Sequence, residues 1–181
     1  ANTAIGKRAF KLGINYANER IQFGEKIANF GAIKEKIATM AARLYGLESS
    51  WNRSAQHIDE VYEELVDQGQ DKLEAKIKSC AEYAMECAII KVYGSEVESY
   101  IVDEALQIHG GMGFSGESEI SVHYRNVRGN RIYEGTNEIN RILTPTMLLR
   151  KAMKGELPFM EKTMALFLSL IHISEPTRPS S

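Results

Sequence analysis

Apolar residues recur every three or four positions along most of the chain, and this pattern predicts long helices. The longest repeat covers residues 30–67, where the apolar positions are Ile33, Ile37, Met40, Leu44, Leu47, Trp51, Ile58 and Leu65. The spacing is typical of the seam of a bundle helix, which would be roughly 55 Å long at about 1.5 Å per residue. Gln68-Gly69-Gln70-Asp71 supplies a turn after it.

The same repeat predicts a helix on each side of this one. The first covers residues 3–22, with Thr3 as its N-cap and Phe23-Gly24 at its end. Small side chains on this helix would let a neighbouring backbone approach closely, at Gly6, Ala9, Gly13 and Ala17. The third helix covers residues 72–108, with a possible kink at Gly94-Ser95.

Glycines and a proline divide the last third of the chain. His109–Phe114 reads as a helix stop and a loop that can approach a ligand, and a short helix follows over residues 118–127. The last helix runs from Thr136 to about residue 154, where Pro145 should kink or split it, with Thr144 capping the second half. Because strand-like alternation is nowhere sustained, the predicted fold is all-α: an up-down-up-down four-helix bundle with one short accessory helix.

The last 14 residues differ in composition from the rest of the chain. Residues 1–167 form the predicted domain, whereas residues 168–181, LSLIHISEPTRPSS, lose the helical period and end in Pro, Arg and Ser. We interpret residues 168–181 as a non-native tail that resembles translated adaptor sequence, and we leave it out of the predicted fold.

Composition excludes several classes of function. A chain of 181 residues suits one domain, and a net charge of −2 predicts no nucleic-acid surface. Cys80 and Cys87 lie within an apolar helical pattern, so we predict reduced core cysteines and no disulfide. The four histidines show no metal-ligand spacing, so no metal site is expected. No N-terminal signal is visible, and the longest apolar run, residues 164–173, is too short to cross a bilayer.

The most informative stretch for chemistry is residues 131–139, RIYEGTNEI. Glu134 precedes a helix that Thr136 can cap, and Gly135 lets a ligand approach the main chain. A carboxylate beside a free backbone N–H suits a general base next to a hydrogen-bond donor. The alternative is an ordinary helix start, where an acidic residue interacts with the helix dipole.

Three separated motifs carry a resemblance to a known family. ERIQFG, QIHGGMGF and RIYEGTNEI, which occur in this order between about residues 3 and 160, resemble the C-terminal flavin-binding domain of the acyl-CoA dehydrogenase family. The combination of QFG-EKI-NFG, GGMGF and EGTN is most similar to the very-long-chain type or its bacterial relatives. The resemblance implies an FAD-dependent oxidoreductase that dehydrogenates fatty acyl-CoA thioesters and passes electrons to an electron-transfer flavoprotein. It also implies a homodimer or homotetramer in the bacterial cytoplasm, the favoured location, or in the mitochondrial matrix.

The resemblance also implies roles for individual residues. Glu134 would take the α-proton of the substrate, and Tyr133 and Gly135 would line the thioester. FAD contacts are implied for the segment that often reaches a neighbouring subunit, Arg20, Gln22 and Phe23, and for Phe30 after it. FAD contacts are also implied for two further segments. The segment that receives adenosine contains Gln107, Gly110 and Gly111, and the helix start contains Thr136 and Glu138.

The chain departs from the family pattern in two ways. Arg125-Asn126 stands where Arg-Asp is usual, and the N-terminal helical and middle β-domains of the family have no counterpart. The isolated chain should therefore be inactive. Two other functions stay open: an acyl-CoA oxidase, which oxygen would reoxidise quickly, and a non-catalytic helical assembly or dimerisation module. Retention of Glu134 together with Gln107, Gly110 and Gly111 favours the enzyme.

Overall fold

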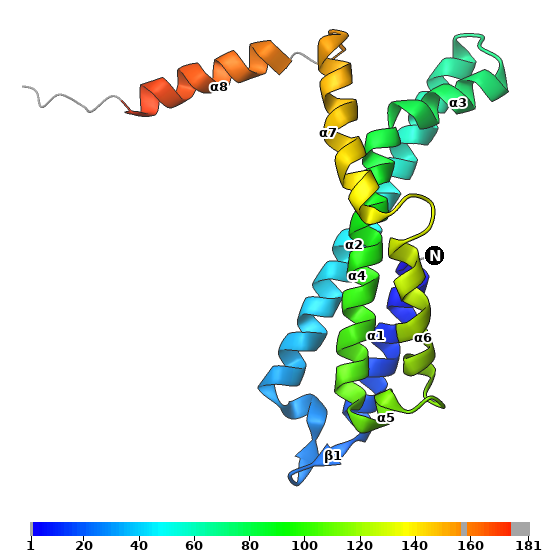
Figure 1. Ribbon diagram of the computed structural model, residues 1–181, viewed down its shortest axis with the longest axis vertical. Helices are drawn as coiled ribbons and strands as arrows, with labels where there is room; N and C mark the ends of the chain where they lie inside the picture. Colours follow the sequence, from blue (N-terminus) through cyan, green and yellow to red (C-terminus); the bar gives the residue numbers. More distant parts are fainter. Residues whose placement is uncertain (1, 157–158, 175–181) are drawn as a thin grey trace, which may run out of the picture. The chain divides into compact units, whose positions relative to one another are not determined.

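The computed structural model describes the backbone of residues 2–156 and 159–174, and almost all of it is helical, which confirms the all-α class (Figure 1). It divides into two units, Ala1–Leu143 and Thr144–Ser181, and each is described by itself. In chain order the elements are α1 Asn2–Glu19, β1 Ile21–Gln22, β2 Glu25–Lys26, η1 Ile27–Asn29, α2 Gly31–Asp67, α3 Lys72–Glu82, α4 Ala84–His109, α5 Gly111–Phe114, α6 Glu119–Val127, η2 Arg128–Arg131, α7 Asn137–Met153 and α8 Phe159–Ser174.

Four helices of the first unit run alternately up and down around one core. In Figure 1, α1 and α4 descend while α2 and α6 ascend. The predicted seam of the second helix is real, because its central positions are buried against α1 and α4. The buried apolar side chains of this core are Ala9, Ala17, Met40, Leu44, Leu47, Val97, Ile101, Val102, Ala105, Ile108, Ile120 and Val127.

The small residues of α1 allow the close approach to α4 that the sequence predicts. Gly6, Ala9, Gly13 and Ala17 are all buried. A Cβ added to Gly13 would lie 3.4 Å from the Cβ of Ala105, so the two helices meet backbone to backbone at this point.

The short helix α6 is fastened to α1 by a bidentate ion pair. The guanidinium of Arg8 donates to both carboxylate oxygens of Glu119, at 2.6 and 2.7 Å. These hydrogen bonds lower the pKa of Glu119 to about 2. The pair is about half exposed, so α6 is held on the bundle mainly by its buried side chains Ile120 and Val127. The helix leads directly into η2 and the loop that carries Glu134.

The first helix is shorter than predicted, because the chain forms a hairpin after Glu19. β1 and β2 pair antiparallel, with Gln22 opposite Glu25. Phe23 (φ 54°) and Gly24 (φ 88°) both adopt left-handed conformations, the type of two-residue turn that matches the twist of a tight hairpin. Gln22 therefore lies on a hairpin strand, whereas Arg20 directly follows the end of the helix, where its backbone N–H donates to the carbonyl of Tyr16 at 2.9 Å. The helix already includes residue 2, so Thr3 lies inside it and is not its N-cap.

The third predicted helix is interrupted, but not at Gly94-Ser95. The break lies at Tyr83 (φ −99°, ψ 19°), between α3 and α4. Gly94 instead lies at a tight contact, where an added Cβ would be 3.2 Å from Cδ1 of Leu47. The glycine therefore serves helix packing, and α4 continues through it.

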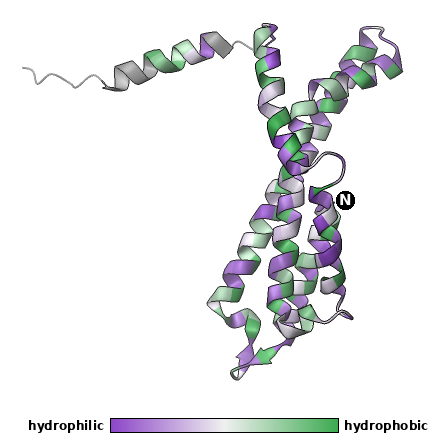
Figure 2. Ribbon diagram, viewed as in Figure 1, coloured by the Kyte–Doolittle hydropathy of each residue, from purple (hydrophilic) through white to green (hydrophobic). Residues whose placement is uncertain are grey.

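The cysteines are free, as predicted, but they are exposed and not in the core. The apolar positions around them are exposed as well: Leu73 and Ile77 on α3, and Ile89 on α4. Figure 2 shows green apolar positions along these helices. The periodic pattern is genuine, but within the first unit nothing that the structure describes covers this face. Burial therefore could not be inferred from the period alone.

The glycine-rich stretch after α4 is more regular than the predicted loop, since Gly111–Phe114 forms one helical turn, α5. The last helix is also more regular than predicted. Pro145 lies inside α7, which runs from Asn137 to Met153 without the predicted split. A proline inside a helix removes one main-chain hydrogen bond, and here that loss does not end the helix.

The predicted loss of helical structure after residue 167 is wrong for residues 168–174, because α8 extends to Ser174. The rest of the predicted tail, residues 175–181, lies outside the described residues. Within the described part of the chain, no helix combines the length and the apolar character needed to span a membrane.

Deleting residues 168–181 is expected to leave the thermal unfolding midpoint of the bundle unchanged within error, because no residue beyond Val127 belongs to the described core. The measurement is the far-ultraviolet circular dichroism signal on heating, for the full and the shortened chain. A decrease of several degrees would show that this segment packs against the bundle and would contradict its interpretation as a non-native tail.

Candidate active site

The residues singled out at 133–136 form a turn between η2 and α7. Glu134 (φ 55°) and Gly135 (φ 83°) are consecutive residues in left-handed conformations. Glycine adopts this conformation freely, but a residue with a side chain pays roughly 1–2 kcal/mol for it. The turn leaves Tyr133 and Glu134 exposed immediately before the helix. Because the backbone of Glu134 is strained and its side chain is exposed, contacts from other residues must hold the turn in this conformation.

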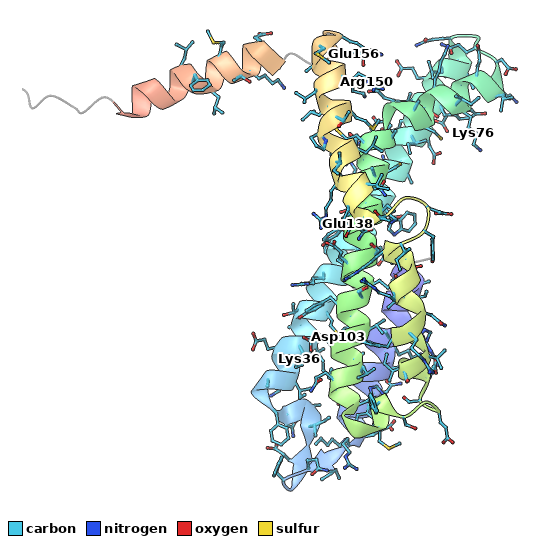
Figure 3. The ribbon with its side chains drawn as sticks, in the orientation of Figure 1. Lys36, Lys76, Asp103, Glu138, Arg150 and Glu156 are labelled. Carbon is cyan, nitrogen blue, oxygen red and sulfur yellow. The ribbon has the colours of Figure 1, made fainter. Side chains whose placement is uncertain are left out.

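Thr136 caps α7, as predicted. Its hydroxyl oxygen accepts a hydrogen bond from the backbone N–H of Ile139 at 3.3 Å. Glu138, labelled at the start of α7 in Figure 3, lies in the first helical turn. Its pKa is lowered, first by a hydrogen bond from its own backbone N–H and then by the Thr136 hydroxyl, with a further contribution from the charge of Arg128. Glu138 therefore has the properties of a charged residue that stabilises a helix N-terminus.

Lys91 and Ser95 of α4 hold the residues that follow Glu134 in this turn. The ammonium of Lys91 donates to the carbonyl of Gly135 at 2.6 Å and to Oδ1 of Asn137 at 2.9 Å. The amide of Asn137 in turn donates to Oγ of Ser95 at 2.9 Å. Ser95 is fully buried and Asn137 is 4% exposed, so this polar cluster is an internal part of the fold.

Glu98 of the same helix holds the segment that precedes the turn. Its Oε2 accepts a hydrogen bond of 2.5 Å from the side-chain amide of Asn130, in η2. Lys91, Ser95 and Glu98 are spaced by four and three residues, which places them on one face of α4. The segment from Asn130 to Asn137 is thus fixed at both ends to one helix, with Glu134 between the anchors.

Sequence reasoning missed these anchors. The signal was present, because Lys91, Ser95 and Glu98 interrupt an otherwise apolar helix at helical spacing. Without the structure, however, nothing linked them to Asn130 and Asn137, which lie more than thirty residues away in sequence.

Glu98 is fully buried, and its second oxygen, Oε1, has no hydrogen-bond partner among the described residues. Burial raises the pKa of this carboxyl group, and the hydrogen bond from Asn130 opposes the shift only in part. A carboxyl group whose pKa is higher in the folded state destabilises the fold as pH rises above its ordinary value, 4.5.

Glu98→Gln is therefore expected to match the wild type near pH 4 and to become the more stable protein toward pH 7, by on the order of 1 kcal/mol. Glutamine keeps the shape and the acceptor for Asn130 but carries no charge. Urea unfolding of both proteins across this pH range measures the difference. Glu117→Gln, at an exposed position, is the control. A stability difference between Glu98→Gln and the wild type that does not change with pH would refute the argument.

A second group of the predicted residues lies at the other end of the bundle. A hollow of about 480 Å³ is lined by Arg20 at the end of α1, by Gln22 from the hairpin, and by Gly110 and Gly111 after α4. The other predicted residues of this end lie near it but do not line it. Gln107 is exposed, and Phe23, at the hairpin tip, is 93% exposed and meets the ring of Phe30 edge to face at 6.2 Å.

The chemistry of this hollow fits a phosphate-bearing cofactor. Arg20 forms no ion pair within the described part of the chain, so its guanidinium is available for an anion. A Cβ added to Gly110 or Gly111 would meet nothing within 4 Å, so a ligand can reach the main chain there. His109, which directly precedes them, makes two contacts within the fold: Nδ1 lies 2.7 Å from the carbonyl of Ala105, and the ring stacks on Tyr16.

The third glycine of this motif serves packing. A Cβ added to Gly113 would lie only 2.6 Å from the backbone carbonyl oxygen of Leu106. The HGGMGF motif therefore combines two open glycines with one that the fold itself requires.

The two groups of predicted residues are far apart. Lys91, which contacts Gly135, and His109, which borders the hollow, both belong to α4. At about 1.5 Å per residue, the length of helix between them places the groups roughly 27 Å apart. The structure therefore divides the predicted site residues into two sites, one at each end of α4.

Comparison with known proteins identifies the fold. Residues 1–146 match the family model described as the C-terminal domain of acyl-CoA dehydrogenases. The chain belongs to the acyl-CoA dehydrogenase family. The Bacillus subtilis (strain 168) protein named "Probable acyl-CoA dehydrogenase" is 47% identical over 97% of the chain. The Macaca fascicularis mitochondrial very long-chain specific acyl-CoA dehydrogenase is 41% identical over 71% of the chain. These relatives agree with the predicted resemblance to the very-long-chain and bacterial types.

Solved structures of the family have the same fold. The Bacillus anthracis acyl-CoA dehydrogenase complexed with FAD superposes with a TM-score of 0.91 over 99% of the chain, at 46% identity.

A more distant relative in sequence, subunit CarC of the Acetobacterium woodii caffeyl-CoA reductase-Etf complex, is 34% identical over 81% of the chain. The chain spans 29% of the length of the B. subtilis relative and 30% of the B. anthracis structure.

Proposed function

We propose that this chain is the C-terminal portion of an FAD-dependent dehydrogenase that forms an α,β double bond in fatty acyl-CoA thioesters, with Glu134 as the base. The observation that carries the proposal is the strained turn at Glu134 and Gly135, fixed to α4 at both ends within a chain of this family. A costly backbone conformation held by several contacts is typical of a functional residue.

Glu134 would accept the proton from the carbon next to the thioester carbonyl. The electron pair of that C–H bond becomes the new double bond as the hydrogen on the next carbon leaves as hydride. Bound FAD supplies the hydride acceptor. An N–H of the turn, at Gly135, would stabilise the negative charge that develops on the thioester oxygen, and Tyr133 would line the same site. Because a base works best in a dry pocket, the exposed carboxylate needs the missing domains to cover it.

The two sites at the ends of α4 would contact different parts of FAD. Thr136 and Glu138 lie beside the base, whereas Arg20, Gln22, Gly110 and Gly111 lie roughly 27 Å away, with Phe23, Phe30 and Gln107 close by. This separation favours an arrangement in which the second group serves the FAD of a neighbouring subunit, in a homodimer or homotetramer. The Etf complex named for the A. woodii relative supports an electron-transfer flavoprotein as the electron acceptor. Because the B. subtilis relative is the more similar, we propose a bacterial cytoplasmic enzyme.

The test is a chimaera in which this chain replaces the equivalent segment of the B. subtilis relative, over the 175 aligned residues. The purified chimaera should contain FAD, and a fatty acyl-CoA should bleach the absorbance of its oxidised flavin. The isolated chain should hold FAD poorly and show no bleaching, since half a site leaves little net binding energy. Rapid reoxidation of the bleached flavin by oxygen would instead indicate an acyl-CoA oxidase. A flavin-loaded chimaera that does not bleach, beside a B. subtilis protein that does, would indicate a non-catalytic assembly module.

A further inference from the structure

We propose that Lys91 is a positioning residue for proton abstraction: its ammonium fixes the Glu134–Gly135 turn to the first residue of α7. The proposal rests on the proposed role of Glu134, and it assigns to α4 a part in the reaction that no motif of the sequence indicates.

The Gly135 carbonyl is the point at which the turn is held. Two donors converge on this oxygen, the Lys91 ammonium at 2.6 Å and the Asn140 side-chain amide at 3.0 Å. The carbonyl belongs to the peptide that directly follows Glu134 and Gly135, so fixing it fixes the direction in which the chain leaves the base. A hydrogen bond from a charged donor is about twice as strong as one between neutral groups.

The ammonium also bonds the helix that follows. Its contact with Oδ1 of Asn137 at 2.9 Å joins the turn to α7, and Asn137 is itself held by Ser95. A lysine offers three donors and can satisfy both oxygens at once. A neutral residue of the same length would leave the carbonyl of Gly135 with Asn140 alone among the donors described here.

Because the backbone of Glu134 is strained, the contact between Lys91 and the Gly135 carbonyl is needed to keep the carboxylate in place. The left-handed backbone of Glu134 (φ 55°) is not its preferred state, so loosening the turn lets the residue relax to a conformation that points the carboxylate elsewhere. Displacement of a reacting group by about 1 Å can reduce a rate on the order of 100-fold. Lys91 would thus affect the rate of proton transfer and not the affinity for substrate or FAD.

The chain offers a matched control. Lys7 and Lys91 both line a hollow of about 690 Å³ between α1, α2 and α4, together with Trp51 and Ile58. Lys7 is paired with Glu48 across this hollow, whereas Lys91 is bonded to the turn. Lys7→Met therefore removes an ammonium from the same hollow without touching the 134–137 segment.

The experiment compares Lys91→Met, Lys91→Arg and Lys7→Met in the FAD-loaded chimaera by rapid-mixing absorbance. Lys91→Met should slow flavin bleaching at saturating acyl-CoA on the order of 10- to 100-fold. The half-saturating acyl-CoA concentration, the FAD content and the thermal midpoint should stay close to wild type. Lys91→Arg, which keeps the charge, should recover part of the rate, and Lys7→Met should behave as wild type. In Lys91→Ala, added methylammonium should restore part of the lost rate.

Two results would overturn the proposal. One is a Lys91→Met protein that bleaches at the wild-type rate. The other is a loss of rate that merely follows a parallel loss of FAD and stability, without recovery by arginine or methylammonium, since that describes a structural residue. Failure of the proposed function would give a different result: Glu134→Gln would bleach as fast as the wild type. In that case the proposed role of Lys91 would also be wrong.

Discussion

Glu134→Gln is expected to leave FAD and acyl-CoA bound to the chimaera but to slow flavin bleaching by about 10²–10⁴-fold, the usual contribution of a positioned base. Glutamine has nearly the same shape as glutamate, so the turn, whose anchors at Gly135 and Asn130 are untouched, should keep its conformation. It cannot accept the α-proton, and departure of the hydride depends on that transfer. The measurement is the decay of oxidised-flavin absorbance after rapid mixing with substrate.

Glu138→Gln is the control for that experiment. Glu138 lies four residues further along and is fully exposed at the start of α7, where its lowered pKa reflects hydrogen bonds from its own N–H and from Thr136. Its replacement should lower the FAD content at most, whereas the bleaching rate of the FAD-loaded protein should change little, because Glu138 interacts with the helix dipole and takes no proton. If Glu134→Gln and Glu138→Gln bleach at the same rate, the base lies elsewhere, and the mechanism proposed for this turn is wrong.

Gly13→Leu is expected to destabilise the bundle by 3 kcal/mol or more, at about the upper end of the cost of overpacking a core. Even a single Cβ at this position would lie 3.4 Å from the Cβ of Ala105 and 3.6 Å from Cδ1 of Ile108. The three further carbons of leucine have no space unless α1 moves away from α4. Urea unfolding of the full chain, followed by circular dichroism, measures the change.

Gly13→Ala separates the effect of volume from the effect of losing glycine. Its Cβ makes an ordinary van der Waals contact, and alanine favours a helix by roughly 1 kcal/mol over glycine. This variant should be as stable as the wild type or slightly more stable. Equal destabilisation by alanine and leucine would mean that α1 needs glycine for its backbone conformation and not for close packing.

The long helices could be predicted from the sequence because their apolar seams are long and regular. In α2 the repeat from Ile33 to Leu47 lies on the buried or half-buried side of the helix, and Thr136 begins the last helix as its capping chemistry indicates. The hairpin at residues 21–26 could not be predicted, since two-residue strands are too short to show alternation. The break at Tyr83 was equally hidden, because it interrupts the backbone without a proline or glycine.

The candidate site was predicted residue by residue but not as an arrangement in space. The motifs identified Glu134 and the residues around Arg20 and Gly110, and whether each has its predicted role stays a prediction. What the motifs could not show is that these groups lie at opposite ends of α4. The anchors Lys91 and Glu98 were missed for a related reason: a hydrogen bond to a residue 44 or 32 positions away leaves no local pattern in the sequence.

The length of α4 has a consequence for how copies of this chain would depend on one another. Under the proposed function, one FAD meets the base of its own subunit and the arginine-bearing end of the neighbour. A change at Glu134 then damages the site of the chain that carries it, whereas a change at Arg20 damages the site of its neighbour. A mixed assembly of one subunit altered at Glu134 and one altered at Arg20 would concentrate both defects in a single site and leave the other intact.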